Sequence, residues 1–215
     1  KAIQLAPRYS WAYGSKGAVL RQLRQYKEAL GALDKALELD PDYSWAYGEK
    51  GEALRLLGEH EEAVQAFDKA TELDPTYGWA YAHKSAALRM LDRFEEALVS
   101  ADKAIELEPT DEMAYGEKGE ALRMLGRYEE ALHALDKAVE LDPAYSWAFG
   151  SRGATLYALR QYKEAVEAFE KATELDPRYT WAYAHKSEAL RMLDRFEEAL
   201  VSAGKAIELE PTDAV

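Results

Sequence analysis

Apolar and polar residues follow each other along this chain with the periodicity of helices, and the pattern returns every 34 positions. In the stretch Ser44–Tyr77, apolar residues recur at three- and four-residue spacing in two successive segments. This spacing places them on one face of a helix. Gly58 separates the two segments, and Pro75 ends the second, because proline cannot continue helical hydrogen bonding. Each repeat is therefore predicted to be a hairpin of two helices.

Six such repeats fill the chain, at residues 10–43, 44–77, 78–111, 112–145, 146–179 and 180–213. Residues 1–9 match the end of a repeat, and residues 214–215 match the start of another. Each hairpin can bury its apolar face only against its neighbours, so residues 1–215 are predicted to form a single all-α solenoid. Neither end carries a polar capping helix, and we expect a segment of a longer array or a consensus-type design.

Small residues occupy fixed positions in every repeat. In the second repeat these positions hold Gly51, Ala63 and Ala70, and the other copies have glycine, serine or alanine there. A conserved small side chain at one phase of an array predicts close approach of helices, because a larger one would overpack the contact. Before two of the second helices, Asp92 and Asp194 are expected to act as capping residues.

The pattern resembles the tetratricopeptide repeat family over essentially the whole chain. The residues that carry the resemblance in the second repeat are Trp45, Tyr47, Gly51, Leu54, Ala63, Phe67, Ala70 and Pro75. The resemblance implies a right-handed superhelix whose concave face, lined by the first helices, binds proteins or peptides. Lys50 departs from the consensus, which prefers leucine there. A long stem with its charged head in water fits this position.

Charge and composition narrow the possible partners. The chain has 27 basic and 40 acidic residues and a net charge of −13, which argues against nucleic acid as a partner, because its binding depends on Lys and Arg. No apolar run approaches the ~20 residues of a membrane span, so no membrane partner is expected. The absence of cysteine fits a reducing compartment such as the cytoplasm without establishing one.

No residue pattern points to catalysis, a cofactor or a metal. The four histidines, His60, His83, His133 and His185, include no pair at metal-ligand spacing. Acidic pairs such as Glu61-Glu62 lie in the first turn of second helices, where the helix dipole favours negative charge. The sequence therefore predicts a protein that is not an enzyme.

The first helices present an outward stripe with two rows of residues. We call them the aromatic ladder, which consists of Trp11, Trp45, Trp79, Trp147 and Trp181, and the basic ladder, which consists of Arg21, Arg55, Arg89, Arg123 and Arg191. Trp and Arg are the residue types that most often dominate binding interfaces, and Arg offers a planar fork to carboxylates. The stripe predicts a groove for an extended peptide or a helix. Its candidate residues are Trp11, Arg21, Trp45, Glu49, Glu52, Arg55, Trp79, His83, Arg89, Glu117, Glu120, Arg123, Trp147, Trp181, His185 and Arg191.

Two alternatives stay open. The ladders can be structural, with Glu52 and Arg55 pairing within one helix and the tryptophans packing on the preceding turn, against Tyr43 or Tyr77. The chain can also self-associate end to end, because uncapped ends expose their contact surface. A chaperone-type clamp for Hsp70 or Hsp90 tails is not expected. The clamp positions hold Gly14, Ala18, Glu49, Trp79 and His83, without the required Lys and Asn.

Overall fold

A computed structural model describes residues 9–210 of the chain, and every regular element within them is an α-helix. The predicted repeat remnants at residues 1–9 and 214–215 lie outside the described residues, apart from Tyr9. The chain divides into two compact units, one up to Pro109 and one from Thr110. We call them the N-terminal unit and the C-terminal unit. The predicted all-α helical repeat array is confirmed.

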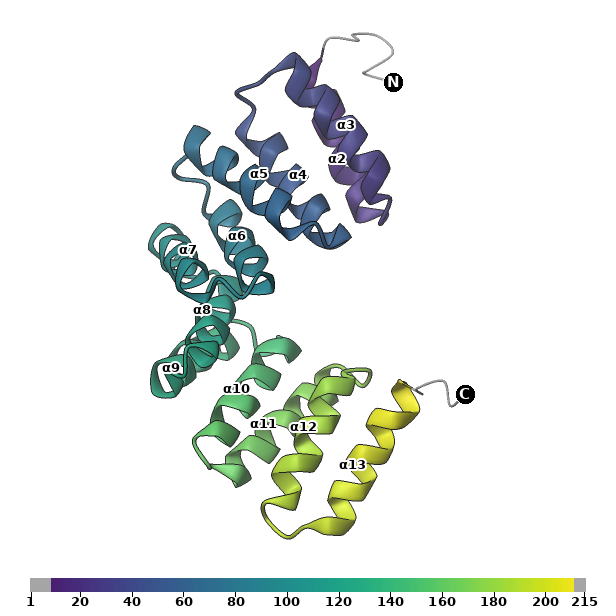
Figure 1. The fold of residues 1–215 in the computed structure, drawn as a ribbon, viewed down its shortest axis with the longest axis vertical. Coiled ribbons are helices and arrows are strands. Elements are labelled where there is room, and N and C mark those ends of the chain that lie inside the picture. Colours follow the sequence, from purple (N-terminus) through teal and green to yellow (C-terminus); the bar gives the residue numbers. More distant parts are fainter. Residues whose placement is uncertain (1–8, 211–215) are drawn as a thin grey trace. The chain divides into compact units, whose positions relative to one another are not determined.

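Each unit consists of three hairpins (Figure 1). The helices of the N-terminal unit are α2 (Ser10–Gln22), α3 (Tyr26–Leu39), α4 (Ser44–Leu57), α5 (His60–Leu73), α6 (Gly78–Met90) and α7 (Phe94–Leu107). Those of the C-terminal unit are α8 (Glu112–Met124), α9 (Tyr128–Leu141), α10 (Ser146–Ala158), α11 (Tyr162–Leu175), α12 (Thr180–Arg191) and α13 (Phe196–Leu209). The even-numbered first helices begin at the first residue of each predicted repeat.

The turn inside each hairpin depends on one residue in the left-handed conformation. Gly58 has φ of 86° after α4 and adopts this conformation without a Cβ clash, as predicted. The predicted capping role of Asp92 and Asp194 is wrong. These aspartates occupy the same turn position, with φ of 56° and 58°, and the following arginines precede the helices without a side-chain cap. Aspartate tolerates this conformation better than most residues, which explains its presence there.

Inside each hairpin, a small residue on the first helix receives a side chain from the second. A Cβ at Gly51 would lie 2.8 Å from the ring of Phe67, which is fully buried. In the next hairpin the same two positions hold Ser85 and Ala101, and the Ser85 hydroxyl donates a hydrogen bond of 2.8 Å to the carbonyl of Ala97. The predicted close contact between the two helices is present. In one copy the small residue packs against a large side chain, and in another it forms a hydrogen bond to the second helix.

Successive hairpins of a unit are joined by two recurring contacts. The Lys50 ammonium lies 2.7 Å from the Asp34 carboxylate on the preceding second helix, and Arg152 bonds Asp136 in the same way at 2.6 Å. The head of Lys50 therefore reaches an acidic partner as well as water. In the second contact, the Tyr77 ring covers Gly48 of the preceding hairpin. Burial raises the pKa of Tyr77 above its usual range.

Candidate functional site

The tryptophans of the first helices are part of the packing between hairpins. The Trp79 and Tyr77 rings are stacked, with centroids 5.7 Å apart, and Trp45 lies on Tyr43 at the same distance. A Cβ at Gly14 would lie 3.1 Å from the Trp45 ring. These contacts are those of the structural alternative. Each tryptophan is nevertheless partly exposed, and Trp11 and Trp181 are 58% and 37% exposed.

In the N-terminal unit, the predicted Arg21 and Glu49 form an ion pair between two repeats. Arg21 Nε donates to Glu49 Oε2 over 2.9 Å, although the residues are 28 positions apart. Glu49 is only 6% exposed, and Arg21 covers it from the first helix of the preceding hairpin. We call the surface formed by the first helices the first-helix face. At this point of the face, the charges of Arg21 and Glu49 neutralise each other.

A second group on this face joins Glu52, Arg55 and His83. The Arg55 guanidinium binds both Glu52 oxygens, at 2.7 and 2.8 Å. His83 Nδ1 lies 3.1 Å from Glu52 Oε2, at ion-pair distance but without hydrogen-bond alignment. Burial alone would raise the pKa of Glu52, but the contacts and charges of Arg55 and His83 outweigh it and lower the pKa to about 2. Glu52 is therefore charged and fully committed to its neighbours.

The remaining candidates are distributed along the face. Arg89 points its guanidinium toward the Met90 sulfur at 3.7 Å, and Arg191 is exposed at the end of α12. Glu117 is buried in α8. His185 Nδ1 lies 2.9 Å from the Trp181 carbonyl, within its own helix. None of these four lines a cavity described below.

The C-terminal unit brings four predicted residues together around one cavity of about 290 Å³. We call it the Trp147 cavity, and it is lined by Glu120, Arg123, Trp147, Ser151, Tyr179 and Trp181. Three first helices, α8, α10 and α12, contribute to it, and Tyr179 comes from the residue before α12. Its volume is at the lower limit of ligand pockets, about 300 Å³, and suits a side chain rather than a large molecule.

The walls of the Trp147 cavity are held in place before any ligand arrives. Arg123 donates two hydrogen bonds to Glu120, at 2.9 and 2.7 Å, in the same pairing within one helix that Arg55 makes with Glu52. Trp181 stacks on Tyr179 with ring centroids 5.8 Å apart. Trp147 lies over Gly116, where a Cβ would come within 3.0 Å of its ring.

Two residues distinguish the two units at this point, because the N-terminal unit has Glu49 where the C-terminal unit has Ser151, and Ala18 where it has Glu120. Ser151 occupies the repeat position that Glu49 holds 102 residues earlier, and Arg123 corresponds to Arg21 in the same way. Glu49 reaches across to Arg21, whereas the short Ser151 side chain leaves space that forms part of the cavity. Sequence reasoning did not include Ser151 or Tyr179. A comparison of the two three-repeat blocks would have revealed the exchange of glutamate for serine.

No group of three or more metal-ligating side chains occurs in the described part of the chain, residues 9–210. None of its helices has the length and apolar character needed to cross a membrane.

Comparisons with known proteins agree with the architecture. Two family models described as tetratricopeptide repeat match, one at residues 16–78 and 152–214 and the other at residues 110–178. A search of curated proteins finds no match.

Among solved structures, the chain is similar to YrrB, described as "a TPR protein with an unusual peptide-binding site". The two share 28% identity over 85% of this chain and 94% of YrrB, with a TM-score of 0.66. It is also similar to MamA, at 25% identity over 75% of this chain and 94% of that one, with a TM-score of 0.64. PilF of Pseudomonas aeruginosa shares the fold at 18% identity, with 95% and 93% coverage and a TM-score of 0.80.

Proposed function

Because the chain belongs to the tetratricopeptide repeat family, a family of protein-interaction scaffolds, we propose that it binds a peptide segment of a partner protein on its first-helix face. The observation that carries this proposal is the Trp147 cavity. There, two members of the aromatic ladder and one arginine of the basic ladder converge on a space of about 290 Å³. The ligand is an extended peptide that inserts one apolar or aromatic side chain between Trp147 and Trp181.

The chemistry of the cavity supports an uncharged side chain. Arg123 and Glu120 neutralise each other, so the cavity offers no net charge to an ion. Its remaining walls are two indole rings, a phenol ring and the small Ser151. Aromatic rings bury much apolar area and attract other rings by offset or edge contacts. Because the walls are already packed in place, binding costs little ordering of side chains.

A C-terminal carboxylate tail of the Hsp70 or Hsp90 type does not fit this proposal. At one clamp position stands Glu49, whose own carboxylate is held by Arg21. A second carboxylate brought to this point would meet a like charge and an arginine that already has a partner.

The test is an exchange between the two units. Peptides are selected from a random dodecapeptide library on the immobilised full chain, and their dissociation constants are measured by fluorescence anisotropy. Ser151→Glu installs the residue of the N-terminal unit, and its longer, charged side chain is expected to fill the cavity beside the Glu120–Arg123 pair and weaken binding at least tenfold. Glu49→Ser is the matched control in the other unit and should leave binding within twofold. Unchanged affinity for Ser151→Glu, with helicity preserved, would contradict the proposal.

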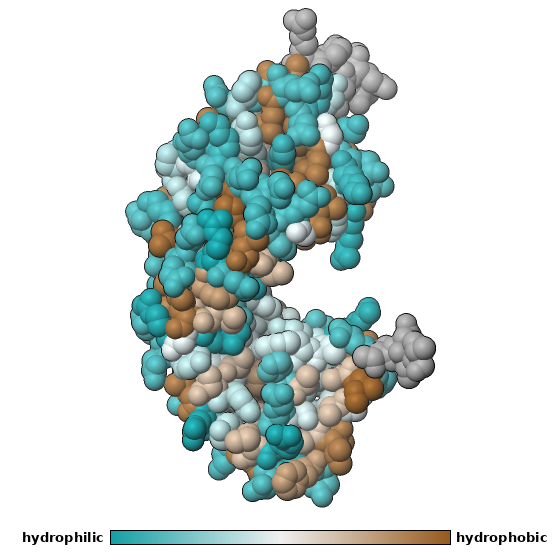
Figure 2. Space-filling model, in the orientation of Figure 1, coloured by the Kyte–Doolittle hydropathy of each residue, from teal (hydrophilic) through white to brown (hydrophobic). Residues whose placement is uncertain are grey.

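Self-association is the second candidate, and exposed apolar residues of α13 favour it. Leu200 and Ile207 are 74% and 67% exposed, and hydrophobic residues are visible on this part of the surface in Figure 2. The corresponding positions of α11, Val166 and Thr173, are buried. Light scattering between ~5 and ~500 μM tests this surface. A strict monomer over this range, or association that Leu200→Lys does not weaken, would exclude it.

A further inference from the structure

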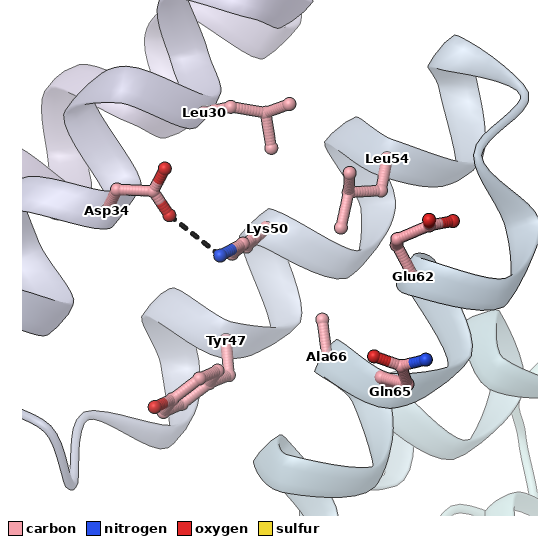
Figure 3. A pocket seen from close by; sticks show the side chains of 8 residues that line it. All are labelled: Leu30, Asp34, Tyr47, Lys50, Leu54, Glu62, Gln65 and Ala66. Atoms are coloured by element: carbon pink, nitrogen blue, oxygen red, sulfur yellow. Dashed lines mark hydrogen bonds and ion pairs between the residues drawn. The ribbon is translucent and has the colours of Figure 1, made fainter.

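A larger cavity lies on the other side of the first helices, in the N-terminal unit. It has a volume of about 410 Å³ and is formed between α3 and α5, with α4 as its floor (Figure 3). We call it the second-helix cavity, and it is lined by Leu30, Asp34, Tyr47, Lys50, Leu54, Glu62, Gln65 and Ala66. None of these residues belongs to the predicted stripe or to the Trp147 cavity.

The base of the second-helix cavity is apolar. Leu54 of α4 and Ala66 of α5 are buried, and Leu30 and Tyr47 extend the apolar wall on either side. Lys50 crosses the cavity toward α3, where its ammonium is held by Asp34 at 2.7 Å. The basic group inside the cavity is thus already neutralised, and the space beside it suits an aliphatic side chain.

One carboxylate at the rim has no partner. In three other hairpins, the glutamate at the Glu62 position is bound by an arginine three residues before it: Arg93–Glu96, Arg127–Glu130 and Arg195–Glu198, at 2.6–2.7 Å. In this hairpin the arginine is replaced by Glu59. Within residues 9–210, Glu62 makes no hydrogen bond or ion pair, and Glu59 and Glu61 add to the negative charge around it.

From this combination we propose that the second-helix cavity is a second protein-binding site, which accepts a segment carrying an aliphatic side chain flanked by arginine or lysine. The aliphatic chain occupies the space over Leu54 and Ala66, and the cation pairs with Glu62. Charge complementarity selects this ligand, because an acidic segment would meet the carboxylate of Glu62 at the rim. The site is separate from the Trp147 cavity, so one chain can hold two different segments at once.

The test uses two short peptides that differ only in charge. Acetyl-SRLRS-amide and acetyl-SELES-amide are titrated into the isotopically labelled full chain, and NMR shifts are followed at the methyl groups of Leu30 and Leu54 and the side-chain amide of Gln65. The basic peptide should produce saturable shifts at these residues, and the acidic peptide should not. Equal shifts from both peptides, or none at millimolar concentration, would overturn the proposal.

Two variants and one control locate the binding. Glu62→Lys removes the acceptor for the cation and should weaken the basic peptide at least fivefold. Ala66→Leu fills the space over Leu54 and should weaken the binding of the basic peptide and reduce the shifts that it causes at the methyl groups of Leu30 and Leu54. Glu164→Lys makes the same charge change at the equivalent position of α11 and should leave the affinity unchanged. Binding that withstands both Glu62→Lys and Ala66→Leu in folded protein would refute the site.

Discussion

The Tyr77 ring rests on Gly48, 29 residues before it, so closely that a Cβ at residue 48 would lie 2.8 Å from Tyr77 Cε1. Gly48 lies inside helix α4, where glycine is normally a disadvantage. The close fit between the two hairpins offsets this disadvantage. The pair thus shows directly how one repeat recognises the next within the unit.

Gly48→Ala should therefore destabilise the protein, although alanine is the better helix former. The added methyl group forces the Tyr77 ring away from its partners, and overpacking of this kind costs ~1–3 kcal/mol. Gly31→Ala is the matched control, because no atom lies within 4 Å of a Cβ there, and it should stabilise by ~0.5–1 kcal/mol. Urea unfolding followed by circular dichroism measures both. Equal effects of the two substitutions would show that the Tyr77 contact is not tight.

The pKa of Glu52 predicts a loss of stability in acid. The carboxylate has a pKa of about 2 in the folded chain against 4.5 for the free group, so its pairing stabilises the fold above pH 4.5. As the pH falls from 4.5 toward 2, the unfolded chain takes up this proton first, and up to about 3 kcal/mol is lost. Glu52→Gln should lack this component, so its stability difference from wild type should shrink over the window.

Urea midpoints at several pH values between 2 and 6 measure this effect. The exposed Glu188→Gln on α12 is the control and should follow the wild-type curve. A Glu52→Gln curve parallel to that of the wild type would mean that Arg55 and His83 do not hold the Glu52 charge.

The Arg21–Glu49 pair predicts an asymmetric result on mutation. Arg21→Ala leaves the buried Glu49 carboxylate without its partner and should cost ~3 kcal/mol, at the lower end for a broken buried pair. Adding Glu49→Ser, the residue that the C-terminal unit carries at Ser151, removes the stranded charge and should restore most of this loss. The free energies of unfolding of both variants decide the matter. A double variant no more stable than Arg21→Ala would disprove the pairing.

The hairpins were predictable because their causes are local. Gly58 and Pro75 end helices through their own backbone preferences, whatever lies around them. The prediction for Asp92 was wrong because the local preference of aspartate is ambiguous. Aspartate is favoured at the position before a helix and is also tolerated in a left-handed turn. The left-handed conformation that Asp92 adopts was decided by the hydrogen bonds of the turn, which the residue type does not reveal.

The candidate site was only partly predictable, because it depends on neighbours far apart in the chain. The stripe of tryptophans and arginines followed from helical periodicity within each repeat. The pairing of Arg21 with Glu49 joins two repeats, and it determines where on the first-helix face the charged side chains neutralise each other. The Trp147 cavity depends on Ser151, whose small side chain is not by itself a sequence signal for a binding site. Glu62 shows the same difficulty, since its missing arginine is noticeable only beside the other copies.

The fit of tyrosine over glycine also restricts how such an array can change in evolution. Tyr43, Tyr77, Tyr145 and Tyr179 follow repeats with Gly14, Gly48, Gly116 and Gly150, whereas Asp111 and Asp213 follow Ala82 and Ala184. A duplication that placed a tyrosine after an alanine repeat would create a poor junction. Exchange of whole three-repeat blocks keeps every junction matched. The near identity of residues 79–109 and 181–211 agrees with inheritance in blocks of this length.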